Sequence, residues 1–310
     1  MLSPDFATHA DVAAGPETVF TGVDTHAHVF TQDMRMIEGR RYTPTYDAVI
    51  ADYLAMLDDN RLSHGVLVQI SFLGTDNRYL VRTLRQEPAR LRGIVVVDPG
   101  ITAEELRALD AVGVVGVRLN LIGLPNPPLP SSDWQKHLRR LAELGWQVEV
   151  QAEARRLPDL LPVLLGAGVR VVVDHFGRPD QASGTGDPGF RYLLTLGKTR
   201  QVWVKLSGAY RNGLAERGER IAASAAPALL GEFGAERLLW GSDWPHTRFE
   251  RPGAATASRE ALDRWIPAVA DRRTILVDSP RRLFRFGSEH GGGIGTGSME
   301  RTSSSSCPDA

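Results

Sequence analysis

The chain has 310 residues, of which 42% are hydrophobic and 24% are charged, and this allows one large globular core or two medium ones. Its 36 basic and 37 acidic residues give a formal net charge of -1, so no broad basic field favours a nucleic acid or an anionic membrane as partner. We therefore expect a small-molecule partner.

The first distinctive stretch follows an N-terminal arm, for which we take residues 1–20. The sequence "GVDTHAHVF", residues 22–30, predicts a buried strand. His26 and His28 should share one face of it, with Asp24 beneath them, because successive strand side chains alternate. Taken alone, one core histidine and one exposed histidine would explain this pair equally well.

The rest of the chain alternates strand and helix patterns. Further runs of β-branched and apolar residues predict strands within 64–72, 91–99, 114–121, 146–154, 169–177, 201–209 and 237–245. Apolar residues at three- and four-residue spacing predict helices within 45–61, 77–90, 102–113, 132–145 and 157–168. Eight strands alternating with helices predict an α/β fold, a (β/α)8 TIM barrel over residues 21–286. Long loops after the strands and short returns place its working face at the carboxyl ends of the strands.

Residues 287–310 are rich in Gly and Ser and predict a disordered tail. The single cysteine, Cys307, lies in this tail, so thiol catalysis is not expected. No apolar run approaches the roughly 18 residues of a membrane span, and no secretory signal pattern opens the chain. We therefore expect a cytoplasmic protein, and the sequence makes no prediction of its oligomeric state.

Polar residues stand where three of the predicted strands end. His175 ends the sixth strand, on the face of its odd-numbered valines, and Asp243 ends the eighth. A turn or cap residue would explain Asp243 alone, but barrel closure brings the first, sixth and eighth strands near one another. The sequence thus predicts one catalytic site of His26, His28, His175 and Asp243.

Arginines provide a second signal. Arg118 lies inside the fourth strand and shares its face with Asn120, while Arg178 and Arg211 follow strand ends. Because arginine is almost never buried without a partner, these guanidiniums are expected to hold a substrate carboxylate at the cavity mouth. Salt bridges to neighbouring acidic residues are the alternative explanation.

The remaining polar candidates carry weaker signals. His64 begins a strand and His137 lies on an amphipathic helix, so both are expected to be structural or solvated. His246 is either a supporting neighbour of the core set or simply a loop residue, and it is left outside that set. Whether Lys205, which shares strand parity with Ser207, faces the cavity stays open.

In chain order from Gly22 to Phe284, the motifs "DTHAHVF", "GVRLN", "LGWQV", "VVVDHFGRPD", "VKLSGAYR" and "LWGSDWPHT" resemble the amidohydrolase superfamily. Within it they resemble the branch of 2-pyrone-4,6-dicarboxylate lactonase and related muconolactone, sulfomuconolactone and sugar-acid lactonases. The resemblance implies a lactone hydrolase of aromatic-compound catabolism. It implies water activation by Asp243, carbonyl polarisation by the three histidines, and carboxylate binding by the three arginines.

The sequence departs from the dicarboxylate lactonase at two places. Leu124 stands where that enzyme has a second arginine, and Gln151 stands where it has a tyrosine. With Asn120, Gln151 remains a predicted substrate-binding residue. The segments "RRYTPTYD" and "SFLGTDNRYL" resemble the muconolactone-hydrolysing relatives more closely. These differences favour a related lactone with fewer or differently placed charges.

Three histidines and an aspartate also form an adequate zinc site. Binuclear members of the superfamily need a bridging Lys or Glu where this chain has Arg118, and mononuclear members usually add a fifth-strand histidine that is missing here. We therefore expect metal-free catalysis, with zinc on His26, His28, His175 and Asp243 as the alternative. A metal-dependent decarboxylase of a small unsaturated or aromatic acid, and a non-enzymatic binder of a small acid, are the competing functions.

Overall fold

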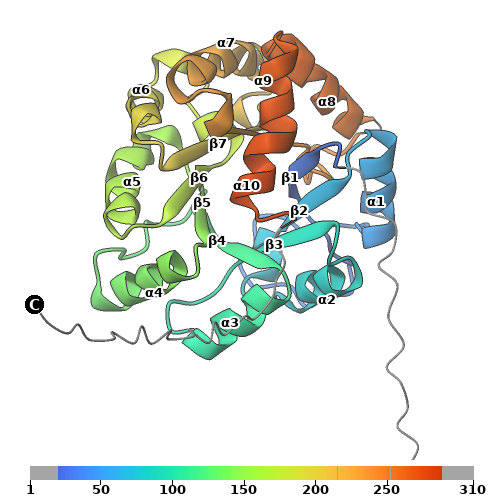
Figure 1. Cartoon of the computed structure of the whole chain (residues 1–310), viewed down its shortest axis with the longest axis vertical. Coiled ribbons are helices and arrows are strands. Elements are labelled where there is room, and N and C mark those ends of the chain that lie inside the picture. The colour runs from blue at the N-terminus through green and yellow to red at the C-terminus, as the bar shows by residue number, and fades with distance from the viewer. Residues whose placement is uncertain (1–19, 215, 252, 288–310) are drawn as a thin grey trace, which may run out of the picture.

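The computed structural model describes residues 20–214, 216–251 and 253–287. The predicted (β/α)8 barrel is confirmed: eight parallel strands pair in chain order, and helices form a ring around them (Figure 1). The strands are β1 (Val23–Ala27), β2 (His64–Val68), β3 (Leu91–Val95), β4 (Val114–Asn120), β5 (Gln147–Gln151), β6 (Arg170–Val173), β7 (Val202–Ser207) and β8 (Leu238–Gly241). Residues 1–19 of the predicted arm and 288–310 of the predicted tail lie outside the described residues.

Ten α-helices are described. They are α1 (Ile50–Asp59), α2 (Arg78–Gln86), α3 (Ala103–Ala111), α4 (Ser132–Glu143), α5 (Leu157–Gly166), α6 (Pro188–Thr195), α7 (Glu216–Phe233), α8 (Ala254–Trp265), α9 (Val269–Arg273) and α10 (Ser279–Leu283). Local chemistry sets some of their starts: Thr102 and Glu105 form a capping box at α3, and Asp187 accepts the Gly189 and Phe190 amides at α6. Within the described residues, no helix combines the length and apolarity needed to cross a membrane.

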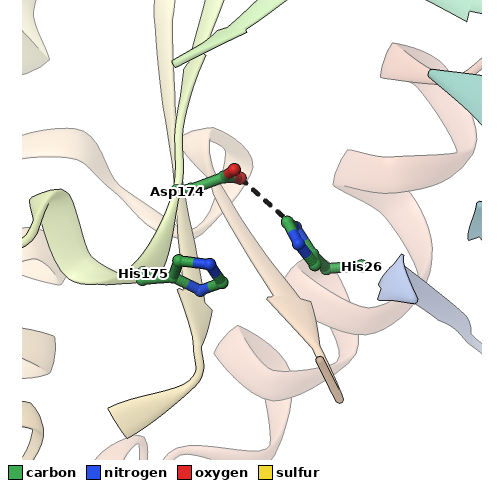
Figure 2. Close-up of side chains that lie close together, drawn as sticks. All are labelled: His26, Asp174 and His175. Carbon is green, nitrogen blue, oxygen red and sulfur yellow. Dashed lines mark ion pairs between the residues drawn. The ribbon is translucent and has the colours of Figure 1, made fainter. Parts of the chain in front are cut away.

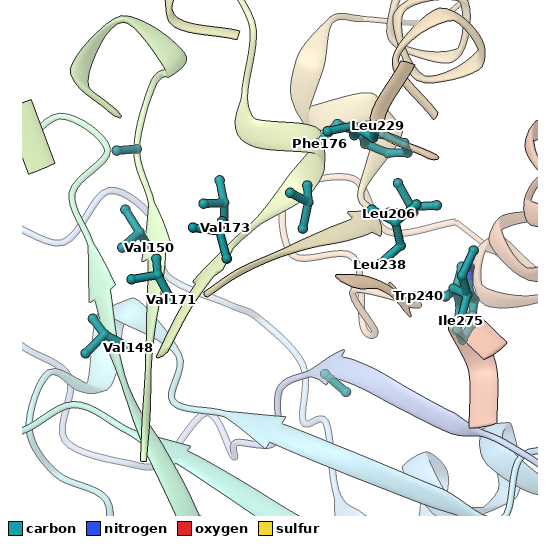
Figure 3. Close-up of a cluster of buried hydrophobic side chains, with 14 of the residues drawn as sticks. Val148, Val150, Val171, Val173, Phe176, Leu206, Leu229, Leu238, Trp240 and Ile275 are labelled. Atoms are coloured by element: carbon teal, nitrogen blue, oxygen red, sulfur yellow. The ribbon is translucent and has the colours of Figure 1, made fainter. Parts of the chain in front are cut away.

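Two apolar layers hold the barrel. The larger layer lies between the outer strand faces and the helices, where Val148, Val171 and Leu206 pack (Figure 3). Burying one such side chain contributes about 1.5–3 kcal/mol. The second layer fills the barrel near the strand starts, where Val66 and Val172 pack with Phe284 just after α10. The amino-terminal end of the barrel is thereby filled with side chains, and polar residues collect at the other end.

The prediction that Asp24 shares a face with the two histidines is wrong. The pairing of β1 with β2 shifts register between Asp24 and Ala27, and such an irregularity changes which face the following residues occupy. Asp24 instead accepts hydrogen bonds from Tyr53 Oη of α1 at 3.2 Å and from Ser242 Oγ at 2.6 Å. Burial raises the pKa of Asp24 to about 6. Its contacts tie β1 to a neighbouring helix and to the loop after β8.

Candidate active site

The strand ends bring the four predicted catalytic residues together. The ring of His26 lies 4.8 Å from that of His175 and 5.0 Å from that of His28, measured between centroids. Asp243 Oδ1 is 3.9 Å from His26 Nε2 and 3.7 Å from His28 Nε2. All four side chains are buried at the carboxyl end of the barrel. Figure 2 shows His26 of β1 opposite Asp174 and His175, which follow β6.

His175 reaches the site by a route that strand alternation does not predict. The valines with which it was expected to share a face, Val171 and Val173, pack outside the barrel against the helices. Backbone φ is 53° at His175 and 58° at Phe176, and this left-handed turn directs the imidazole into the barrel mouth. Asp243 also has a positive φ, of 62°. Such uncommon conformations concentrate at functional sites.

Asp243 is held as a carboxylate by its neighbours. Arg211 contacts both of its oxygens, through Nε to Oδ2 and through Nη2 to Oδ1 at 3.1 Å. Tyr210 Oη donates to Oδ2 at 2.6 Å. Burial alone would raise the pKa of Asp243, but the charge of the adjacent Arg211 acts against burial, and the pKa is held well below its ordinary value. Arg211, expected to hold a substrate carboxylate, thus has Asp243 as its partner in this structure.

Burial favours the neutral form of all three histidines. Burial lowers the pKa of His26 to about 3, and it also lowers the pKa values of His28 and His175. His28 Nδ1 lies 2.7 Å from Val68 O, and because a carbonyl oxygen only accepts, Nδ1 carries the proton. His28 therefore presents the lone pair of Nε2 to Asp243. Two acceptors face each other there, an arrangement that suits a water molecule or a cation between them.

A buried charge network beneath the site escaped the sequence analysis. Lys205 Nζ lies 2.7 Å from Glu149 Oε2, 3.5 Å from Asp174 Oδ1 and 3.2 Å from His26 Nδ1. All four side chains are fully buried. Since an ammonium only donates, the contact with His26 leaves the proton of that ring on Nε2. The 3.3 Å approach of Asp174 Oδ1 to the same Nδ1 is tolerated because the ammonium neighbours both atoms.

Burial raises the pKa of Glu149 to about 7, although Lys205 opposes the rise. For Asp174, burial acts in the same upward direction, but Lys205 and His26 hold its pKa well below the ordinary value. The sequence signal for this network was charged residues at inward-facing strand positions. The shortest contact, from Lys205 of β7 to Glu149 of β5, joins strands that are not neighbours, so strand order alone does not reveal it.

Above the histidines lies a cavity of about 280 Å³. Arg118 crosses its floor and donates to Gln151 Oε1 at 2.5 Å and to Gln69 O at 3.0 Å. The lining contains every predicted substrate-binding residue and two arginines that the sequence analysis missed: Arg41, Arg118, Arg178, Arg211, Arg248, Asn120 and Gln151. Leu124, by contrast, is 58% exposed. The five arginines in its lining make the cavity strongly cationic.

The other predicted residues fall elsewhere. His64 stacks on Phe20 at the opposite end of the barrel, 4.2 Å between ring centroids. His137 is buried on α4 beside Trp134. His246 is buried in the loop after β8, and its ring lies 5.9 Å from that of Tyr210. It therefore flanks the residue that binds Asp243.

The donor atoms at the site fit a divalent metal ion in type and spacing. His26, His28 and Asp243 each offer one ligand atom within 4.8 Å of the others, and so do His26, His175 and Asp174. Nε2 of His26 and Nε2 of His175 have no hydrogen-bond partner among the described residues. Against an ion stand the proton on His26 Nε2 and the Arg211 guanidinium, which already neutralises Asp243.

Comparisons with known proteins agree with this geometry. The sequence model of the family described as Amidohydrolase matches residues 23–286. A 4-sulfomuconolactone hydrolase of Rhizobium radiobacter is 34% identical over 279 residues, covering 84% of this chain and 89% of that protein. A 2-pyrone-4,6-dicarboxylate hydrolase of Comamonas testosteroni is 32% identical over 285 residues, with 84% and 89% covered.

A crystal structure is also similar. It is that of a probable 2-pyrone-4,6-dicarboxylic acid hydrolase from Acinetobacter baumannii with citric acid bound. The two chains are 42% identical and align with a TM-score of 0.83, over 86% of this chain and 99% of the other. The likeness covers the strands and loops that build the site.

Proposed function

This chain belongs to the amidohydrolase family, as its motifs predicted, and on that premise we propose that it hydrolyses the ester bond of a small carboxylated lactone. The observation that carries the proposal is the cluster of Asp243 and three buried histidines, beneath a cavity lined by arginines. The names of the similar hydrolases support a muconolactone, a sulfomuconolactone or a pyrone dicarboxylate as the substrate type. That the protein acts in aromatic-compound catabolism and lies in the cytoplasm stays a prediction.

The reaction needs a nucleophile, stabilisation of the tetrahedral oxyanion and a proton for the leaving alkoxide. Asp243 Oδ1 and His28 Nε2 are 3.7 Å apart, close enough for one water molecule to donate a hydrogen bond to each. Asp243 takes a proton from this water as it attacks the lactone carbonyl, and then returns the proton to the ring oxygen. A positioned base of this kind contributes roughly 10²–10⁴-fold in rate.

His26 and His175 stabilise the oxyanion in this proposal. Nε2 of His26 carries its proton because Lys205 donates to Nδ1, so an N–H group lies 3.9 Å from Asp243 Oδ1, beneath the cavity. A single oxyanion donor contributes about 10²–10³-fold. Arg118 and Arg178 hold the substrate carboxylate, and Arg211 keeps Asp243 ionised. A divalent ion on His26, His28, His175 and Asp243 would supply Lewis-acid polarisation of the carbonyl.

The test is hydrolysis of muconolactones, pyrone dicarboxylate and sugar-acid lactones by protein treated with a chelator, with metal content measured on the same batch. We expect ring opening to continue without metal. We also expect Asp243→Asn to lower kcat by about 10²–10⁴-fold. Loss of activity on stripping and its return with zinc would overturn the metal-free mechanism.

Two further outcomes separate the competing functions. Metal-dependent release of carbon dioxide, without ring opening of any lactone, would identify a decarboxylase. Ligand binding by Asp243→Asn with turnover equal to that of the native protein would identify a binder.

A further inference from the structure

Two of the cavity arginines come from loops and form no ion pair with any of the described residues. Arg41 lies between β1 and α1, and Arg248 lies in the loop after β8; both line the cavity together with Arg178. Among the described residues, none of these three forms an ion pair within 4 Å. Partial burial and the charges of Arg248 and Arg211 lower the pKa of Arg41. The Glu153 carboxylate opposes this lowering at Arg41 without forming an ion pair with it.

The two loops are fastened to each other. Tyr42 Oη and Tyr46 Oη each donate to Glu250 Oε1 at 2.8 Å, and the backbone N–H of Arg248 donates to the same oxygen at 2.8 Å. Glu250 thus joins the loop that carries Arg41 to the loop that carries Arg248. Its Oε1 accepts all three hydrogen bonds, and among the described residues Glu250 forms no ion pair with either guanidinium.

Arg41 is also placed against the barrel. Its Nη2 donates to Asn120 Oδ1, at the end of β4, at 3.4 Å. Arg118 lies two residues earlier on the same strand but deeper, where it is only 4% exposed. One guanidinium therefore lies on the cavity floor, and a second lies at its rim above the same strand.

We propose that Arg41 and Arg248 form a second anion subsite, which takes a second carboxylate or a sulfonate on the lactone while Arg118 and Arg178 hold the first anionic group. This inference rests on the proposed lactone hydrolysis. With a volume of about 280 Å³ the cavity is small for a ligand site, so two substituents of one ring can reach its floor and its rim.

The experiment compares two lactones of the same ring, one with a single carboxylate and one with an additional carboxylate or sulfonate. We expect the ratio of kcat/KM, doubly over singly charged, to fall about tenfold in Arg41→Gln or Arg248→Gln and about a hundredfold in the double variant. Arg41→Lys, which keeps the charge, should recover part of the ratio. Separate sulfonate and carboxylate substrates show which group the subsite prefers.

Arg40→Gln is the matched control, because Arg40 is an exposed neighbour whose guanidinium bonds Thr43 and the Ile37 carbonyl. It should keep the native ratio. An equal change with both lactones, or none, in correctly folded Arg41 and Arg248 variants would overturn the subsite.

Citrate binding, measured by calorimetry, distinguishes failure of the subsite from failure of the function. If the native protein opens no lactone but the Arg41 and Arg248 variants bind citrate at least tenfold more weakly, the subsite stands and the proposed reaction falls. If lactones are opened and neither the substrate ratio nor citrate affinity changes, the subsite falls alone.

Discussion

Replacement of Arg211 by glutamine tests how Asp243 is kept ionised. Burial raises the pKa of Asp243 and the Arg211 charge lowers it, so removing the charge lets burial dominate and the pKa rises. Two unit charges about 4 Å apart interact by ~4 kcal/mol at an effective dielectric constant of 20, equivalent to about 3 pH units. This is an upper bound, because the Arg118 charge near Asp243 remains. We expect the acid limb of kcat/KM to move up by roughly 2 pH units.

The assay is the pH profile of kcat/KM for the best lactone of the panel. The acid limb should move to higher pH because Asp243, the base, must be unprotonated to accept a proton. Tyr210→Phe removes one neutral hydrogen bond, of 2.6 Å, and should move the limb in the same direction by less than about 1 unit. Arg178→Gln removes a charge that acts on Asp243 without a hydrogen bond to it, and should move the limb upward by less than Arg211→Gln does. A limb that stays in place in Arg211→Gln while kcat falls would refute the reasoning.

Two further predictions concern buried groups. Lys205→Met leaves the carboxylates of Glu149 and Asp174 buried without their ammonium, so we expect a loss of about 3–5 kcal/mol in urea unfolding. Lys205→Met combined with Glu149→Gln should recover part of that loss, and a single variant within 1 kcal/mol of native would contradict the account. Burial lowers the pKa of His137 from 6.5 to about 4, so its stabilising contribution is complete above pH 6.5 and is lost as the pH falls toward 4. The melting temperature of His137→Leu should therefore decline less over this range than that of the native protein, and equal declines would contradict this.

The barrel could be predicted from the sequence because its signals are repetitive. Each strand reads as an apolar, β-branched run, and the expected helices carry apolar residues at helical spacing. Strand alternation also placed Arg118 and Asn120 correctly, and both line the cavity. At two other places an irregular backbone made the alternation rule fail. The register shift in β1 turned Asp24 away, and the left-handed turn at His175 turned that residue inward.

The site residues that the sequence analysis missed are far apart along the chain, and only the folded structure brings them together. Lys205 and Glu149 lie on strands that are not neighbours, and only barrel curvature brings them within 2.7 Å. Arg41 and Arg248 belong to loops whose paths no periodicity describes. Their approach depends on contacts such as that of Tyr42 with Glu250, which joins residues 208 positions apart.

The contacts between β1 and the loop after β8 mean that the site is complete only after this loop has been synthesised. Across this seam, Asp243 N donates to His26 O at 2.8 Å, and His28 N donates to Trp244 O at 2.8 Å. Asp24 accepts the Ser242 amide from 218 residues away. At roughly 5–20 residues per second, a ribosome needs about 10–45 s to make the second side of this seam after the first. A nascent chain that has folded β1 to β7 holds all three histidines but not the base, Asp243. We therefore expect activity to begin only after β8 has closed the barrel.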